Sequence, residues 1–368
     1  MTIESTIISF ITLCTCLVAA NIALFPRRLN LDREKARKSR IQEKALRMFM
    51  DSNTGNADAV KADAYWKRLR RRLRRPDMLM AYVETAERVL EEYGEEKKEW
   101  YLKLAVPVFS RLCSVYEKKS MTMMTCFVYV LGRMLCCGME PDPRIWEFLY
   151  VRLRSESLVC RQNAFSAIFS AGDAEKAVRA VLYMNRTYET YNDKLITEGM
   201  LRFEGELQDL AERLWKIYDG LNNDFKLAVL NFLRLSSDRY SDRMLAVLQD
   251  ATADKELHYA VIRYLGKYPD EAARPVLLSL LEKDGRDTWV YAAVSAQALG
   301  AYPGEDTFDA LKKALFSPDW YLRLNASASL ERLGIDYLKL SDVINSSDRY
   351  AREMAQYRLE ETESGAEG

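Results

Sequence analysis

Histidine is almost absent from this sequence, which has a single one, His258, in 368 residues. A hydrolytic triad needs a general base, and a zinc site needs several cysteine or histidine ligands, yet no C-x-x-C pair occurs. The glycine-rich patterns that bind phosphates, G-x-x-x-x-G-K-[ST] and G-x-G-x-x-G, are also missing. We therefore predict no catalytic, cofactor-binding or metal-binding residues and no enzymatic activity. His258 is interpreted as a packing residue that faces a neighbouring helix.

The chain also lacks an excess of charge of one sign, because 54 basic residues balance 54 acidic ones. This balance removes any global argument for nucleic acid, which we regard as an unlikely partner. The charges are nevertheless unevenly placed. Residues 26–75 contain seventeen Lys and Arg against six Asp and Glu, so a basic segment precedes an acidic body. This asymmetry indicates a local function for the basic segment.

One long segment has no charge at all, from Thr6 to Phe25. A helix of about twenty residues matches the hydrocarbon core of a bilayer, roughly 30 Å thick, and this favours a membrane anchor. A cleaved signal peptide and a buried core helix are the alternatives, but a signal peptide would have a basic start. Because arginines follow the segment, we expect a single-pass protein of the inner or plasma membrane, with its body on the cytoplasmic side. The odd number of cysteines, seven, agrees with reduced thiols.

A helical pattern recurs through the rest of the chain and is clearest before Gly300 and Gly334. Small residues stand eight positions before these glycines, at Ala292 and Ala326, and larger apolar residues follow on the same helical stripe. Related sets occur at spacings of 30 to 40 residues. We predict helical hairpins that stack on one another, with each glycine in the left-handed conformation that ends a helix. The other sets precede Gly132, Gly172, Gly205, Ser236 and Gly266.

From about Met124 to Gly334 these residues resemble HEAT repeats, particularly the short bacterial kind. A HEAT second helix often opens with Asp and then Val-Arg, and the segment with Asp319, Arg323 and Ala326 follows this closely. Arg161 stands at the matching position before Ala164. The tetratricopeptide repeat ranks second, because it places its glycine in the first helix. The resemblance implies an all-α fold, an α-solenoid of about seven hairpins after the transmembrane helix, and specifies no activity.

These patterns divide the chain into four segments. We predict a transmembrane anchor over 1–25, a basic juxtamembrane helical linker over 26–76, a HEAT-like α-solenoid over 77–360 and a disordered tail over 361–368.

The stretch "YWKRLRRRLRRPD" at 65–77 is the strongest site candidate. Trp66, Leu69 and Leu73 fall on one helical stripe, and basic residues occupy the rest. The helix could lie on an anionic leaflet or a membrane partner, which we rank first, or bind nucleic acid, which we rank last. It could instead be a solvated helix whose arginines pair with Glu84, Glu87, Glu91 and Glu95. The predicted membrane- or partner-binding residues are Arg27, Arg28, Lys67, Arg68, Arg71, Arg72 and Arg75.

We predict a membrane-anchored scaffold that binds an unidentified protein partner, as an accessory subunit of a membrane complex. The alternative is a ligand-binding module or an enzyme of the HEAT-like lyase type. A broad groove would favour the scaffold, whereas an acidic or aromatic pocket lined by several repeats would favour the alternative.

Overall fold

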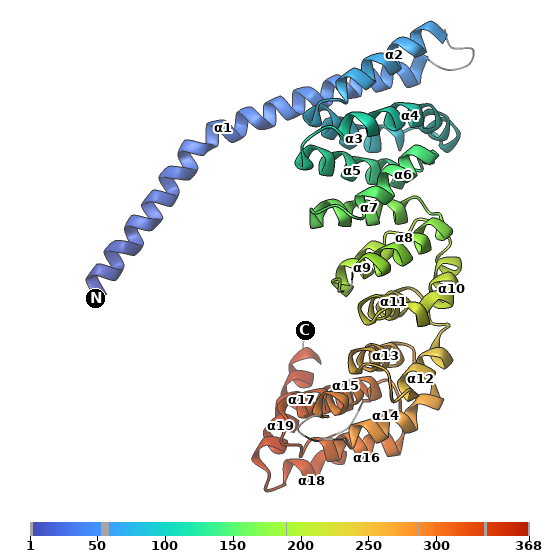
Figure 1. The fold of residues 1–368 in the computed structure, drawn as a ribbon. Coiled ribbons are helices and arrows are strands. Elements are labelled where there is room, and N and C mark those ends of the chain that lie inside the picture. The colour runs from blue at the N-terminus through green and yellow to red at the C-terminus, as the bar shows by residue number, and fades with distance from the viewer. Residues whose placement is uncertain are drawn as a thin grey trace. The chain divides into compact units, whose positions relative to one another are not determined.

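The computed structural model describes the backbone of residues 3–52, 59–188, 190–283, 285, 288–334 and 337–366. Within these ranges, side chains are described except at 3–9, 11, 15–31, 59–61, 337–338 and 358–366. The described residues form nineteen α-helices, three short 3-10 helices and no strand (Figure 1). The all-α prediction is confirmed, and the succession of helical hairpins fits an α-solenoid.

The first of two compact units contains residues 1–180 and 202–205. Its helices are α1 (Ile3–Ser52), α2 (Ala59–Arg72), α3 (Pro76–Leu90), α4 (Glu95–Tyr116), α5 (Met121–Cys136), α6 (Pro143–Arg152), α7 (Leu158–Ser170) and the first part of α8 (Ala174–Thr187). Each helix packs on the second one along the chain, so that α1, α3, α5 and α7 form one layer and α2, α4 and α6 form another. The side chains of Tyr82, Tyr101, Phe109 and Phe127 are fully buried between these layers. Stacked hairpins therefore build this core.

The second unit contains residues 181–201 and 206–368 and repeats the arrangement. Its helices are α9 (Asp193–Met200), α10 (Leu207–Ile217), η1 (Tyr218–Gly220), α11 (Asn223–Ser236), α12 (Ser241–Gln249), α13 (Lys255–Lys267), η2 (Glu271–Ala273), α14 (Arg274–Leu281), α15 (Trp289–Leu299), α16 (Glu305–Ala314), α17 (Trp320–Arg332), η3 (Tyr337–Leu340), α18 (Ser341–Ile344) and α19 (Arg349–Ala366). Helices α9 to α19 with odd numbers stack in sequence, and Ala292 and Ala326 are fully buried where α15 meets its neighbours. The predicted small-residue stripe thus lies at the helix contacts.

The glycines of the repeat differ in conformation from what we expected. Only Gly172 and Gly334 of the predicted set have the positive φ of a left-handed residue, and both follow a helix. Gly132 and Gly266 instead lie inside α5 and α13. A Cβ added at Gly266 would lie 2.9 Å from the Cα of Ala298 on α15, the helix that packs on α13. These two glycines are needed for close helix approach rather than for termination.

The aspartate and arginine of the HEAT-like pattern hold the start of an odd-numbered helix, such as α17, to the loop before it. Asp319 caps α17 by accepting a hydrogen bond from the backbone N–H of Leu322 at 2.9 Å. The buried guanidinium of Arg323 donates to the carbonyl oxygens of Ser317 and Pro318 at 2.6 and 3.1 Å. Arg161 makes the equivalent bonds before α7, to the carbonyls of residues 155 and 156.

Both ends of the chain differ from the predicted segments. In the described part of the chain, no helix is long and apolar enough to cross a membrane, and most side chains of the predicted anchor at 1–25 lie outside that part. The anchor is therefore not supported. At the other end, α19 continues through Ala366, so the predicted disordered tail is helical up to that residue, while 367 and 368 lie outside the described part.

The segment 26–76, predicted as a linker, belongs to the helical stack. Leu46, Phe49 and Met50 of α1 are buried, and so are Leu69 and Leu73 of α2. Because these residues pack on α3 and α4, the second part of α1 and all of α2 form the first hairpin of unit 1. The prediction of about seven hairpins was too low, because it left out α1 to α3 at this end and α18 and α19 at the other.

Candidate functional site

The basic helix α2 is fixed in unit 1 by its apolar side. Leu69 and Leu73 are 3% and 0% exposed, and the ring of Tyr65 stacks on Phe49 of α1 with centroids 4.1 Å apart. The hydroxyl of Tyr65 also shares a hydrogen bond of 2.9 Å with that of Tyr101. Since this side of α2 faces the core, the opposite side carries the exposed cations. They are Lys67, Arg68 and Arg71, with Arg70 and Arg72 half-buried at the edges, and the exposed Arg74 and Arg75 follow in the turn after α2.

Most of these cations have no carboxylate partner among the described residues. Lys67 pairs with Asp63 on its own helix at 2.6 Å, and Arg75 pairs with Asp77 at 3.0 Å. Arg68, Arg71 and Arg74 form no ion pair with any residue whose side chain is described. Of the predicted site residues, Arg27 and Arg28 have side chains outside the described part.

Three of the four glutamates that we considered as partners of α2 are engaged elsewhere, and the fourth, Glu91, forms no ion pair with a described side chain. Glu84 pairs with Lys35 of α1 at 2.9 Å, and Glu87 pairs with Arg133 of α5 at 2.5 Å. Glu95 pairs with Lys98 on its own helix. The interpretation of α2 as a helix neutralised by these glutamates is therefore wrong, and its positive charge stays uncompensated in the described part of the chain.

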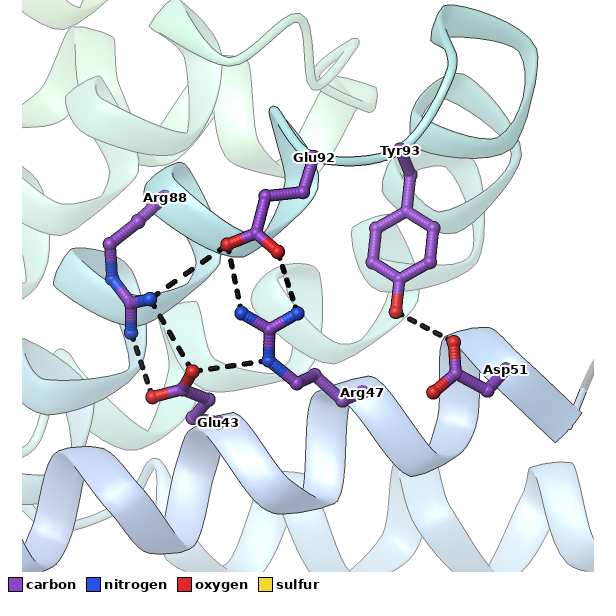
Figure 2. Close-up of polar contacts among 6 residues, drawn as sticks. All are labelled: Glu43, Arg47, Asp51, Arg88, Glu92 and Tyr93. Carbon is purple, nitrogen blue, oxygen red and sulfur yellow. Dashed lines mark hydrogen bonds and ion pairs between the residues drawn. The ribbon is translucent and has the colours of Figure 1, made fainter.

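A ring of four charged residues holds α1 on α3 (Figure 2). Arg47 of α1 binds both carboxylate oxygens of Glu92 at 2.7 and 2.8 Å and also reaches Glu43 at 3.1 Å. Arg88 of α3 donates to both oxygens of Glu43, at 2.8 and 3.3 Å. Arginines and glutamates thus alternate across the two helices, a geometry in which each guanidinium satisfies a carboxylate with more than one hydrogen bond.

The arginines change the titration of these carboxylates. Hydrogen bonding to Arg88, and then to Arg47, lowers the pKa of Glu43, and hydrogen bonding to Arg47 lowers the pKa of Glu92. One turn further, the hydroxyl of Tyr93 donates to Asp51 at 2.8 Å. The ring therefore keeps both glutamates charged, and it holds α1 on α3.

Helix α1 continues the basic surface of α2. Asp77 accepts ion pairs from both Arg75 and Lys38, so the end of α2 lies beside this part of α1. Four exposed cations of α1 recur every three or four residues and therefore share one face. This face points away from the side that packs on α3, as the exposed face of α2 points away from α4. We call the combined surface the basic end face: Arg33, Arg37, Arg40 and Lys44 of α1, Lys67, Arg68 and Arg71 of α2, and Arg74 and Arg75 of the turn that follows α2.

Unit 2 contains a separate cavity of about 570 Å³ between consecutive hairpins. Trp215 and Tyr218 stack in its wall with ring centroids 4.7 Å apart. The hydroxyl of Tyr218 is buried and has no hydrogen-bond partner in the described part of the chain. Aspartates 219, 250 and 254 line the cavity together with Lys226 and Arg243. Sequence reasoning missed this site, because its residues come from four α-helices, a 3-10 helix and a loop and match no motif.

An exposed aromatic cluster lies at the starts of the layer helices α15, α17 and α19. Trp289 stacks on Tyr321 with centroids 5.8 Å apart, and Trp320 meets the same ring edge-on at 5.0 Å. Trp320, Tyr321 and Tyr350 are 51%, 56% and 64% exposed. Arg323, which lies over the ring of Tyr350 at 5.1 Å, links the two halves of the cluster.

His258 is a packing residue in the structure, as interpreted from the sequence. It is 8% exposed. Its Nε2 lies 3.0 Å from the carbonyl oxygen of Asp250, which can only accept, so Nε2 is the donor. Its Nδ1 lies 2.8 Å from the hydroxyl of Tyr291. Both ring nitrogens are therefore used within the fold.

Comparison with known proteins supports the helical-repeat assignment. HEAT repeats match residues 241–331, which lie within unit 2. No curated protein matches the chain. Among solved structures, human deoxyhypusine hydroxylase in complex with glycerol is similar over 84% of this chain and 100% of its own, with 17% sequence identity and a TM-score of 0.28.

The prediction that the chain has no enzymatic activity is corrected by this comparison. The matched structure is that of an enzyme, and the prediction is withdrawn. The low identity and TM-score carry no activity, substrate or site residue over to this chain.

Proposed function

We propose that the chain is a helical-repeat scaffold that binds a protein partner through the aromatic cluster of unit 2. The observation that supports this is the exposure of Trp320, Tyr321 and Tyr350, each more than half exposed, on neighbouring layer helices. Exposed contiguous aromatic surface is uncommon on proteins without a partner, and Trp and Tyr are enriched where binding energy concentrates. HEAT repeats over part of this unit agree with a scaffold.

The experiment is purification of the full chain from detergent-solubilised membranes, with identification of the proteins that accompany it. A triple variant, Trp320→Ala, Tyr321→Ala and Tyr350→Ala, should lose a partner that the native chain retains. Leu207→Ala with Leu235→Ala is the matched control, because both leucines are exposed in the same unit but outside the cluster. If the triple variant melts like the native chain and retains every partner at native levels, the cluster is not the binding surface.

A location at the membrane is part of the same proposal and rests on the uncharged sequence from Thr6 to Phe25. The scaffold would then serve as an accessory subunit of a membrane complex, with its body on the cytoplasmic side. A reporter that is active only outside the cytoplasm, fused after Gly368, should be silent, and the chain should remain in the membrane pellet after carbonate extraction. Recovery of the chain in the soluble fraction would contradict this location.

A second candidate function, the binding of a small ligand, is favoured by the cavity of unit 2. An acidic and aromatic pocket lined by several repeats is the feature that distinguishes this alternative, and the cavity with Trp215 and Tyr218 has that character. In a thermal-shift screen of common metabolites, a true ligand should raise the melting temperature of the native chain but not of Ala246→Trp, which fills the cavity. Equal shifts in both proteins would rule the cavity out.

A further inference from the structure

We propose that the basic end face binds the surface of a bilayer that contains anionic lipid. This goes beyond the scaffold function and does not depend on it, because the face lies on α1 and α2 of unit 1 and the aromatic cluster lies in unit 2. The proposal rests on three features of the face: uncompensated charge, a shared orientation of two helices, and exposed aliphatic side chains among the cations.

The charge of the face exceeds what the described part of the fold neutralises. Of its nine cations, only Lys67 and Arg75 form ion pairs with residues whose side chains are described. Of the carboxylates of α3, Asp77 is shared between Arg75 and Lys38, and Glu84 and Glu87 are held by α1 and α5. Seven clustered cations that form no ion pair with a described side chain attract an anionic surface at long range, within the Debye length.

The two helices present their cations in the same direction. On α1 the cations stand at 33, 37, 40 and 44, the spacing of one helical stripe, while Leu46 and Met50 are buried on the other side. On α2 the exposed Lys67, Arg68 and Arg71 likewise lie on the side opposite the buried Leu69, and the exposed Arg74 and Arg75 follow in the turn after the helix. Since no helix of the described chain covers the outer side of this first hairpin, the face is available to an extended surface.

Aliphatic side chains decide between a bilayer and a nucleic acid. Ile41 and Met48 are 42% and 61% exposed on the stripe of α1 that carries Arg37, Arg40 and Lys44. A helix that lies at a membrane interface combines such apolar residues with flanking cations, which reach the lipid phosphates. Binding sites for single-stranded nucleic acid use exposed aromatic rings instead, and the residues of this face include none.

The test uses the full chain with a fluorescent non-canonical amino acid at Met48 and vesicles that carry a spin-labelled headgroup lipid. Contact with the bilayer surface brings the quencher to position 48, however the rest of the chain is attached. We expect quenching in vesicles with phosphatidylserine that is about threefold or more above that in phosphatidylcholine alone, and that falls as NaCl is raised. Equal quenching in both vesicles would overturn the proposal.

Two variants with the same change in net charge distinguish an effect of this face from an effect of the overall charge. Arg37→Gln, Arg40→Gln, Arg68→Gln and Arg71→Gln should abolish the difference between the two vesicles. Lys118→Gln, Lys119→Gln, Arg239→Gln and Lys255→Gln change exposed cations elsewhere and should preserve it. Both variants should melt like the native chain, because exposed charges contribute little to stability. If the two variants lose quenching equally, or if a DNA duplex at equal phosphate concentration removes it from the native chain, the bilayer is not the specific occupant.

Discussion

Arginines that bind loop carbonyls recur in this chain at the scale of single residues. Arg161 and Arg323 both donate to two carbonyl oxygens five or six residues earlier, and Arg352 donates to that of Ser346 at 2.8 Å. A carbonyl oxygen at the end of a loop needs a donor when it is removed from water. The arginine supplies this donor and at the same time fixes the start of its helix (α7, α17 or α19) on the preceding loop.

Arg323→Met should destabilise unit 2 by about 1–3 kcal/mol, because it leaves two carbonyl groups without their charged donor. Urea unfolding followed by circular dichroism measures this. Arg349→Gln is the control, since Arg349 is exposed and pairs only with Glu353 on its own helix, and its loss should change little. Equal unfolding midpoints for native chain and Arg323→Met would show that the loop is not held by this side chain.

Gly266→Ala should also destabilise unit 2, although alanine favours a helix by about 1 kcal/mol over glycine. The added Cβ would lie 2.9 Å from a backbone atom of Ala298, which cannot move without separating α13 from α15, and overpacking of this kind costs about 1–3 kcal/mol. Gly220→Ala is the control, because its Cβ would meet nothing within 4 Å. A native or raised melting temperature for Gly266→Ala would contradict the close approach.

These residues show how far sequence patterns reach at this scale. The positions of Asp319 and Arg323 could be predicted, because the cap and the arginine act on atoms a few residues away. The conformation of Gly266 could not, because the reason for glycine there is a helix 32 residues later in the chain. The pairing of Glu84 and Glu87 failed for the same reason, since their partners come from α1 and α5.

At the scale of elements, the ring in Figure 2 is the polar part of the contact between α1 and α3. Glu43 and Glu92 have lowered pKa values because of Arg88 and Arg47. A carboxylate whose pKa is lower in the folded chain stabilises the fold above the ordinary value of 4.5, and this contribution disappears as the pH falls through the lowered pKa. The contact should therefore weaken in acid.

Hydrogen exchange of residues 42–52 should thus accelerate between neutral pH and pH 3, beyond the change expected from intrinsic exchange chemistry. In the variant Arg47→Gln with Arg88→Gln, these residues should exchange faster at pH 7, and their exchange should accelerate less between pH 7 and pH 3. Arg213→Gln serves as the control, because its ion pair with Asp209 lies within α10 and joins no second helix. If exchange in the double variant accelerates in acid as much as in the native chain, other carboxylates hold α1.

The number of hairpins could be predicted only where the repeat signature is complete. The second part of α1 and all of α2 lack the small residue and glycine of the repeat, and a run of cations dominates their sequence, so the sequence predicts a linker there. Their few buried residues, such as Leu46 and Leu69, belong to the core because α1 packs on α3 and α2 packs on α4, and the sequence does not reveal these contacts. The last pair was missed because α18 has only four residues, although Asp348, Arg352 and Ala355 repeat the pattern of α17.

At the scale of the whole molecule, the three candidate surfaces are distributed over the two units. The basic end face belongs to unit 1, and the cavity and the aromatic cluster belong to unit 2. The basic segment was predictable from composition, because charge is visible without a fold. The cavity and the cluster were not, because they arise where residues from consecutive hairpins meet.

Stacked repeats couple mainly to their nearest neighbours, so damage to one helix contact should spread locally. Ala326 is fully buried where α17 packs on α15, and Ala326→Phe should overpack this contact by about 1–3 kcal/mol. Hydrogen exchange should then accelerate in α15, α17 and α19, while α3 and α5 of unit 1 keep their native protection. Ala251→Phe, at an exposed position of the same unit, should leave exchange unchanged. Equal acceleration in both units would mean that the chain unfolds as one cooperative body, and native exchange everywhere would mean that Ala326 does not lie at a tight helix contact.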